Sequence, residues 1–580
     1  MVNELSDFQT IIDVLRFRAL TQPEKIAYTF LGDDDVKTSI SYFELNRKAK
    51  TVATFLKAAG LSGSPVLLAY PTGIEFIICF LGCLYARSIA IPVYPPDPIN
   101  LNSTLPRLEA IVGNSGSKAL LTDANLIESV SPLLGHFPLF SALKKISLNS
   151  IDVNTIDEDI GSDVGLDTIA FLQYTSGSTS RPKGVILNHK NIIEFEKRLQ
   201  WGMSFYEDAT YVGWLPLHHD AGLIGNTLCS LYGGTHCVFM SPLTLLKRPF
   251  KWLKAISDYK GTTSGGPNFG YELCVRKVSE EQRNALDLSH WKVAWSSAEP
   301  VRYETIERFS SYFQPCGFKK SSFHPCYGLA EATLAVTYSK EGPRYIHLER
   351  KSLEKNIAKV DIQTTNSTIL VSAGKIYTYQ NLRIIDPKTR QECREDQVGE
   401  IWIQGPNVAL GYWDNPEETK TTFQAEIEGK DLGFFLRTGD MGFLKDDELY
   451  ITGRLKDMLI IRGQNYYPQD IELVAEKAHP SIRPGCVASF STENNEEERL
   501  VLLAEIYSKD VKKNNNDEKI YEEFLTSIKR KIQAAVIDFF QIQAYKIILL
   551  EENTLPKTSS GKHQRFLAKE KFLKNSLRVL

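Results

Sequence analysis

Short apolar runs alternate with amphipathic stretches in the first third of the chain. Residues 66–70, 89–93 and 118–122 each predict a buried strand, and the apolar residues 73–86 predict a helix between the first two strands. Strands that alternate with helices are typical of a parallel sheet. We therefore expect an α/β fold in this part of the chain.

The pattern changes towards the C-terminus. Alternating apolar and polar residues at 399–405 predict a strand in a strand-rich region that begins near residue 384. Residues 500–506 predict another strand and residues 518–539 a long amphipathic helix, which together indicate a small α/β domain. A chain of 580 residues is too long for one compact core, so more than one domain is expected.

Composition and charge argue against several classes of protein. The formal net charge of −3 argues against a dedicated nucleic-acid binder. Nine cysteines without a CxxC pair argue against zinc ribbons and thioredoxin-like sites, and reduced thiols suit a cytoplasmic protein. The best candidate for a membrane segment, residues 74–86, contains Glu75 and is shorter than the ~20 apolar residues that span a bilayer. We therefore expect no integral membrane segment.

Residues 174–184, Tyr-Thr-Ser-Gly-Ser-Thr-Ser-Arg-Pro-Lys-Gly, follow an apolar run at 169–172 that predicts a strand. Glycine lets the backbone approach an anion, hydroxyls and N–H groups donate to phosphate oxygens, and the two cations add positive charge. The Lys-Gly order departs from the Gly-Lys-Ser/Thr of a P-loop, which argues against a Walker-type site. We expect a polyphosphate loop, with a solvated turn as the alternative. Its candidate binding residues are Thr175, Ser176, Gly177, Ser178, Thr179 and Lys183.

Five further motifs follow this loop along the chain. They are Trp-Leu-Pro-Leu-His-His-Asp-Ala-Gly-Leu-Ile-Gly at 214–225, Ser-Ala-Glu-Pro at 297–300, Cys-Tyr-Gly-Leu-Ala-Glu at 326–331, Arg-Thr-Gly-Asp at 437–440 and Pro-Lys-Thr-Ser-Ser-Gly-Lys at 556–562. With the loop they resemble the adenylate-forming superfamily, which includes acyl-CoA synthetases, luciferases and the adenylation domains of peptide synthetases. Leu-Ala-Glu-Ala-Thr at 329–333 resembles one branch, the fatty acyl-AMP ligases. The resemblance covers nearly the whole chain.

The resemblance implies a fold and a division into domains. It implies an α/β fold in which a large N-terminal domain of doubly wound sheets, with a small β-barrel-like subdomain, spans residues 1–455. A small mobile α+β domain, residues 456–580, then carries the catalytic lysine, and Lys456 holds the hinge position. Residues 344–368 match the place where fatty acyl-AMP ligases carry an extra segment that restrains the C-terminal domain and disfavours CoA. A variable surface loop is the alternative there, and a short helix is expected near 353–358.

The resemblance also implies the residues of the site. Lys562, His219 and Glu331 are the expected catalytic residues, and Glu331 is the expected magnesium ligand because Mg²⁺ prefers one or two carboxylates together with phosphate oxygens. Tyr327 is expected to stack on adenine and Asp440 to accept the ribose hydroxyls. The other expected nucleotide-binding residues are Ser297, Ala298, Glu299, Cys326, Gly328, Leu329, Ala330 and Arg454.

The acyl pocket is expected around the motif at 214–225. Its candidate residues are Trp214, His219, Asp220, Gly222, Gly225 and Phe269. Phe269 lies in a Gly-Gly-Pro-Asn-Phe-Gly stretch for which a plain turn is an equal alternative. The adjacent His218, His219 and Asp220 do not favour a zinc site, because three consecutive side chains seldom point at one centre. A structural role is expected for His218.

The implied reaction is the ATP-dependent activation of a medium- or long-chain fatty acid. Attack of the carboxylate on the α-phosphorus gives an acyl-adenylate and pyrophosphate, with ATP and Mg²⁺ as cofactors. The branch transfers its acyl group to the phosphopantetheine of an acyl carrier protein, which is expected here as a separate chain. An acyl-CoA synthetase is the alternative. A non-catalytic nucleotide-binding regulator is disfavoured because Lys562, Glu331 and Asp440 are all present.

Overall fold

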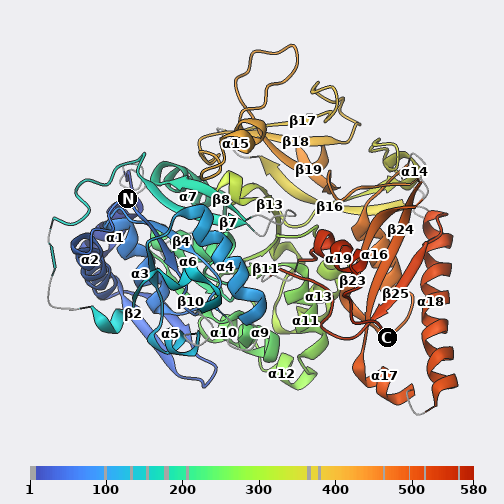
Figure 1. Ribbon diagram of the computed structural model, residues 1–580, viewed down its shortest axis with the longest axis horizontal. Helices are drawn as coiled ribbons and strands as arrows, with labels where there is room; N and C mark the ends of the chain where they lie inside the picture. Colours follow the sequence, from blue (N-terminus) through green and yellow to red (C-terminus); the bar gives the residue numbers. More distant parts are fainter. Residues whose placement is uncertain are drawn as a thin grey trace.

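A six-stranded sheet forms one part of the N-terminal half in the computed structural model (Figure 1). Neighbouring strands are parallel, except for the last two, which are antiparallel. The strands predicted at 66–70, 89–93 and 118–122 are confirmed to within two residues. In spatial order the strands are β6 (Lys144–Ile146), β5 (Ala119–Leu121), β3 (Pro65–Leu68), β4 (Ile89–Pro92), β7 (Ile169–Thr175) and β8 (Lys183–Asn188).

The predicted apolar helix is α3 (Ile74–Tyr85), in which every residue except Glu75 is buried. It packs on α2 (Tyr42–Ala58) at a point where a Cβ on Gly82 would lie 2.5 Å from Cγ1 of Val52. The absence of a side chain at Gly82 therefore lets the two helices approach closely. None of the helices in the described residues combines the length and the apolar character that crossing a membrane requires.

A second sheet runs through the middle of the molecule. Its first part is parallel from β1 (Ile26–Leu31) through β10 (His236–Met240), β9 (Thr210–Gly213), β11 (Thr263–Gly266) and β12 (Val293–Ser296) to β13 (Phe323–Gly328). It continues as antiparallel strands where the β-barrel-like subdomain is expected. Among the described residues the order of these strands is open, so the structure shows no closed barrel there. These strands are β14 (Ala335–Tyr338), β16 (Ser367–Ile376), β20 (Glu448–Arg454), β19 (Leu436–Lys445), β18 (Gly399–Gln404) and β17 (Asn381–Ile385).

The C-terminal part has its own sheet and its own hydrophobic core. The sheet consists of β23 (Ile482–Asn494), β24 (Glu497–Ile506) and β25 (Lys546–Leu550), and the helices α16 (Pro468–Lys477) and α18 (Glu518–Phe540) pack against it. The predicted strand at 500–506 and helix at 518–539 are thus confirmed. In Figure 1 this part lies beside the second sheet, with α18 along its outer edge. The exact boundary between the domains, 455/456, stays a prediction.

The segment 344–361 lies between the second sheet and the C-terminal part. It contains β15 (Tyr345–Glu349), which pairs with β16, and α14 (Arg350–Leu353). The helix expected near 353–358 is therefore wrong by one turn. The chain leaves the helix at Glu354, and Asn356 adopts a left-handed φ of 59°, which a continuing α-helix cannot accommodate.

The structure describes residues 8–96, 101–130, 135–151, 156–157, 159–175, 182–203, 208–361, 367–376, 380–461, 464–494, 497–514, 517–558 and 562–580.

Candidate active site

The predicted phosphate loop connects β7 to β8. Thr175 ends β7, Lys183 begins β8, and the two residues are partners in the antiparallel register. The ammonium group of Lys183 forms an ion pair with Glu418 and lies 5.2 Å from the centre of the Tyr412 ring. The hairpin thus holds both ends of the loop together, and one predicted cation already has a carboxylate partner. The candidates Ser176, Gly177, Ser178 and Thr179 lie outside the described residues.

A buried carboxylate stands where the sequence predicts ribose binding. Asp440 on β19 accepts a hydrogen bond from the Tyr327 hydroxyl (2.8 Å) and another from Nε of Arg454 (2.9 Å). Tyr327 comes from β13, and Arg454 is the register partner of Asp440 on β20. The carboxylate raises the pKa of Arg454, while burial and then Asp440 raise the pKa of Tyr327. Two strands and a tyrosine therefore fix the orientation of this carboxylate.

The segment 297–299 follows β12 and lies next to the end of β13. The thiol of Cys326 donates to the carbonyl of Ser296 across 3.7 Å, which joins the two strand ends. Ala298 has a left-handed φ of 74°, and Oε1 of Glu299 is buried without a hydrogen-bond partner in the described part of the chain. An unpaired buried oxygen is costly, so this geometry favours a ligand with a donor at that place. Ser297 belongs to the same turn.

The chain turns sharply between β13 and the carboxylate of Glu331. A Cβ on Gly328 would lie 1.7 Å from the carbonyl oxygen of Leu334, so this position requires glycine. Leu329 precedes the short 3₁₀ turn Ala330–Ala332, which carries Glu331. Oε1 of Glu331 accepts from the Tyr412 hydroxyl (2.8 Å). This bond holds the side chain in one orientation.

Glu331 is the residue to test as a metal ligand. No group of three or more histidine, cysteine or acidic side chains that could enclose a metal occurs among the described residues. A single carboxylate nevertheless fits Mg²⁺, because this ion keeps several water ligands and takes the remainder from one or two carboxylates and phosphate oxygens. The donor set around Glu331 is therefore compatible with a magnesium ion that arrives with a nucleotide.

The histidine motif sits at the start of a π-helix, Ala221–Leu228, whose N-cap is Asp220. Nδ1 of His219 lies 2.5 Å from Oδ1 of Asp220, and the same oxygen accepts from the N–H of Ala221. His218 has a different environment. Burial, followed by the charges of His219 and Arg107, lowers its pKa to about 3, so it is neutral. The motif therefore presents one oriented His–Asp pair and one neutral histidine.

One predicted acyl-pocket residue, Trp214, is a buried indole that packs against another, Phe269. Trp214 packs edge-on against Phe269, with ring centres 5.5 Å apart. A Cβ on Gly266 would lie 2.4 Å from Cζ2 of Trp214 and one on Gly270 2.9 Å from it, so two glycines make room for this ring. Gly222 is equally restricted, since a Cβ there would lie 2.1 Å from the carbonyl oxygen of Pro216. Gly225 faces the side chain of Leu334, which a Cβ would approach to 3.0 Å.

Lys562 reaches this region from the far end of the chain. Burial lowers the pKa of its ammonium group and Arg454 lowers it further, whereas Asp220, Asp440 and Glu299 raise it. Asp220, Glu299 and Asp440 each belong to a different motif of the N-terminal part, and Arg454 is the register partner of Asp440. The terminal lysine is therefore within electrostatic reach of the predicted ribose carboxylate and of the His–Asp pair together.

Two hydrogen-bonded supports hold the segment that carries Lys562. Its N–H donates to Oγ1 of Thr558 (3.0 Å) and its carbonyl accepts from the N–H of Thr558 (2.8 Å). Three residues further on, Arg565 binds Glu472 through Nε (2.8 Å) and Nη2 (2.7 Å), and Asp457 through Nη1 (3.0 Å). This cluster fixes the start of α19 (Arg565–Leu573) on the C-terminal domain.

Residues 15–413 match the AMP-binding enzyme family. The chain belongs to this family. Residues 446–579 of this AMP-binding enzyme also match the "Meiotically up-regulated gene 62 protein-like domain". The resemblance to fatty acyl-AMP ligases is confirmed by the relatives that follow.

The AMP-binding enzyme is 43% identical to a medium-chain-fatty-acid–acyl-carrier-protein ligase of Moorena producens, over 98% of this chain and 96% of that protein. It is 34% identical to a 4-hydroxyphenylalkanoate adenylyltransferase of Mycobacterium marinum, over 97% and 91%. Among solved structures, a fatty acyl-adenylate ligase of Legionella pneumophila in complex with acyl adenylate and pyrophosphate is 37% identical, with a TM-score of 0.75 over 99% and 98%. Another, from studies of the Escherichia coli and L. pneumophila ligases, has a TM-score of 0.86 at 31% identity over 98% of both chains. The mixed α/β fold with a large N-terminal and a smaller C-terminal domain is thereby confirmed.

The motifs of the AMP-binding enzyme do not single out Tyr412 or Glu418. Both contact predicted site residues, Glu331 and Lys183, from distant positions in the chain. The Gly-Tyr-Trp stretch at 411–413 is visible in the sequence only as the end of a strand-rich segment. Tertiary contacts alone identify the two residues as part of the site.

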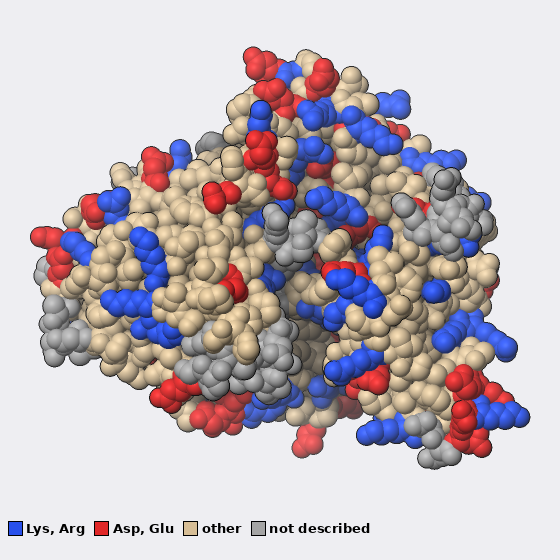
Figure 2. Space-filling view, viewed as in Figure 1, with Lys and Arg blue, Asp and Glu red and all other residues tan. Residues whose placement is uncertain are grey.

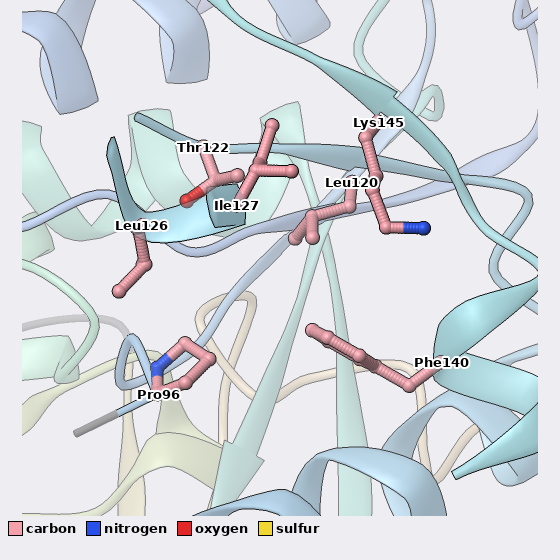
Figure 3. Close-up of a pocket in the computed structure, with 7 residues that line it drawn as sticks. All are labelled: Pro96, Leu120, Thr122, Leu126, Ile127, Phe140 and Lys145. Carbon is pink, nitrogen blue, oxygen red and sulfur yellow. The ribbon is translucent and has the colours of Figure 1, made fainter. Parts of the chain in front are cut away.

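Figures 2 and 3 show two hollows of the molecule. Figure 2 shows the surface hollowed between the N-terminal sheets and the C-terminal domain, with cations gathered beside the hollow. Figure 3 shows a small, mostly apolar pocket elsewhere, into which Leu120, Phe140 and Pro96 point. None of the predicted site residues lines the pocket of Figure 3. It is therefore separate from the candidate active site.

Proposed function

We propose that this AMP-binding enzyme is a fatty acid–AMP ligase, which joins a medium- or long-chain fatty acid to the AMP part of ATP and releases pyrophosphate. The observation that carries the proposal is that Asp220, Asp440, Glu299 and Arg454, which are far apart in the sequence, all lie near enough to Lys562 for their charges to shift the pKa of its ammonium group. A cation of the last motif near the residues expected to bind ribose and the acid supports this reaction. The names of the relatives support a fatty acid as the substrate.

The nucleotide is held at the ends of the central strands. Asp440 accepts the ribose hydroxyls, and the bonds from Tyr327 and Arg454 keep its carboxylate ready for them. The ring of Tyr327 offers an aromatic face to adenine. The backbone of residues 297–299 and 326–330 borders the base, and the unpaired oxygen of Glu299 can accept from an amino group. The phosphates extend towards the loop that starts at Thr175.

The fatty acid lies with its tail among Trp214, Phe269 and the glycines Gly222 and Gly225, and with its carboxylate near His219. Its carboxylate attacks the α-phosphorus while the bond from phosphorus to pyrophosphate breaks, so two anions must meet. Lys562 and the loop cations offset this repulsion. Electrostatic stabilisation of the charge that develops in the transition state is usually the largest single contribution to catalysis. Holding the reactants in line contributes ~7–11 kcal/mol at best.

We propose Glu331 as the ligand of a magnesium ion that enters with ATP. Held by Glu331, such an ion would offset part of the negative charge of the phosphates. Tyr412 orients Glu331 for this task through its hydroxyl. The roles predicted for the other site residues are part of the same proposal. They include phosphate binding by residues 176–179, which lie outside the described part of the chain.

We further propose that the acyl group passes to the phosphopantetheine of a separate acyl carrier protein, after residues 456–580 turn about Lys456. Two features support this acceptor: the relatives named as acyl-carrier-protein ligases and the contacts of segment 344–361. Arg350 of that segment donates to the carbonyl of Phe539 (2.8 Å), and Glu354 accepts from Asn465 (3.2 Å). These contacts restrain the C-terminal domain and so disfavour CoA. A cytoplasmic location suits the nine free cysteines.

The test is a two-stage assay on the full chain. In the first stage the protein receives ATP, Mg²⁺ and saturated fatty acids of increasing length, and pyrophosphate and acyl-adenylate are measured. In the second stage CoA or a phosphopantetheinylated acyl carrier protein is added. Acyl-adenylate followed by acyl transfer to the carrier supports the proposal. Rapid acyl-CoA formation identifies an acyl-CoA synthetase, and no acyl-adenylate with any acid identifies a regulator.

A further inference from the structure

Arg565 is bound by two carboxylates that come from different parts of the C-terminal domain. Its Nε and Nη2 donate to Glu472 on α16 (2.8 and 2.7 Å), and its Nη1 donates to Asp457 (3.0 Å). Arg565 begins α19, three residues beyond Lys562. Asp457 directly follows Lys456, the proposed hinge residue. The planar guanidinium, which offers donors in a rigid fork, therefore joins the segment of Lys562 to the hinge.

Glu472 is the firmly held partner in this arrangement. Its side chain is buried and also accepts hydrogen bonds from the N–H (2.8 Å) and the hydroxyl (3.3 Å) of Ser489 on β23. Nδ1 of His563, the residue after Lys562, lies 3.5 Å from Oε2 of Glu472. Burial acts to raise the pKa of Glu472, but Arg565 and His563 outweigh it and lower that pKa, so the carboxylate is ionised. In Figure 1, α19 lies beside α16 and β23.

Asp457 belongs to a hydrogen-bonded turn that reaches the predicted ribose site. Its N–H donates to the carbonyl of Arg454 (3.1 Å), so these two residues close a turn around Lys456. Nε of Arg454 donates to Asp440 (2.9 Å), the carboxylate proposed to bind ribose. A continuous path of contacts therefore leads from Arg565 through the hinge turn to Asp440.

We infer that Arg565 is a positioning residue for adenylation, which holds the segment of Lys562 against the hinge turn and so keeps the lysine in place beside Asp440. The inference rests on the proposed function, because the role of Lys562 belongs to it. The backbone hydrogen bonds between Lys562 and Thr558 shape the segment itself but do not reach the hinge. A displacement of ~1 Å can slow a reaction by ~10²-fold, so a support outside the site affects the rate.

The inferred role predicts an effect on one half-reaction only. In the proposed function, acyl transfer takes place after residues 456–580 have turned about Lys456. A residue that positions Lys562 is therefore needed for adenylation and not for transfer. A residue that only stabilises the fold would affect both half-reactions.

The experiment measures both half-reactions with the full-length protein. Arg565→Met is expected to slow adenylation by roughly 10–100-fold, the range that a misplaced catalytic group produces, and to leave transfer from purified acyl-adenylate near the wild-type rate. Arg565→Lys keeps the charge but not the fork, and should recover part of the adenylation rate. Asp457→Ala removes only the contact with the hinge and leaves the pair with Glu472 intact. It should melt like the wild type and still slow adenylation severalfold.

A double variant tests whether Arg565 acts through Lys562. Arg565→Met added to Lys562→Ala should cause no further loss of adenylation, because the ammonium group that is positioned is already absent; independent effects would multiply. The matched control is Arg483→Met. Arg483 pairs with Glu505, another buried carboxylate of the same domain, so this variant also loses a buried ion pair. It should destabilise the protein in thermal melting but leave adenylation at the wild-type rate.

An unchanged adenylation rate in Asp457→Ala, or losses that multiply in the double variant, would overturn the inference. Equal losses of adenylation and transfer in Arg565→Met, or an equal loss of adenylation in Arg483→Met, would assign Arg565 to folding alone and overturn it too. Failure of the proposed function has a different signature, because the wild type itself would then make no acyl-adenylate from any fatty acid.

Discussion

Replacing Lys562 by alanine tests whether the C-terminal domain completes the active site. The ammonium group lies near enough to Asp220, Asp440 and Glu299 for each carboxylate to raise its pKa, so its positive charge is placed beside the predicted ribose and acid sites. Removing one such fixed donor of charge stabilisation typically raises the barrier by ~2.7–4 kcal/mol. Since each 1.36 kcal/mol corresponds to a factor of ten, Lys562→Ala should slow adenylation by roughly 10²–10³-fold.

The assay is single-turnover release of pyrophosphate at saturating ATP and fatty acid, followed separately by acyl transfer from purified acyl-adenylate. Transfer should stay near the wild-type rate, because the proposed turn of residues 456–580 about Lys456 moves Lys562 away from the site before that step. Lys574→Ala is the matched control. Lys574 lies just beyond the end of α19, is exposed and, within the described part of the chain, forms its ion pair with Glu570 four residues before it, so its loss should leave both rates unchanged. Near-normal adenylation by Lys562→Ala, or an equal loss in the control, would refute the reasoning.

Three further predictions concern binding, acceptor choice and pH. Asp440→Asn should raise the KM for ATP by roughly 10–100-fold, because hydrogen bonds to a charged group are lost, while the KM for the fatty acid stays constant; steady-state kinetics measure both. Arg350→Ala should raise CoA-dependent turnover severalfold. It removes a hydrogen bond to the carbonyl of Phe539 (2.8 Å) and the contact of the guanidinium carbon with the Phe539 ring, whose centre lies 3.5 Å away. An unchanged ratio of CoA use to carrier use would contradict this prediction. Burial raises the pKa of Asp470 to about 7, so ionisation costs stability as the pH rises from ~4 through 7. At pH 8 Asp470→Asn should therefore melt at a higher temperature than the wild type, with a free energy of unfolding that is larger by at most ~4 kcal/mol. Near pH 4 the two proteins should melt alike.

Much of the fold is readable from local patterns. The buried strands β3, β4 and β5 and the helix α18 follow from apolar runs and helical spacing, because these signals depend on which side of an element meets the core. The helix α14 is less predictable. Its position depends on a left-handed residue, Asn356, and on packing between two domains, neither of which leaves a periodic pattern.

The sequence predicts only part of the candidate site, because many of its contacts join residues that are far apart in the chain. Residues that lie within motifs, such as Asp440 and Lys562, are identified by the strings around them. Their partners are not, because Glu418 lies 235 positions from Lys183 and Tyr412 lies 81 from Glu331. Such contacts arise where the ends of different strands and loops meet, so the spacing of residues along the sequence does not reveal them.

The most direct measurement is the identity of the product formed in one turnover. The wild-type protein is mixed in stoichiometric amount with ATP, Mg²⁺ and a medium-chain fatty acid, quenched, and analysed by mass spectrometry. The account predicts one acyl-adenylate and one pyrophosphate per active site before any acceptor is added, and no such product in the absence of the acid. ADP and phosphate, or unreacted ATP with every acid tested, would contradict it.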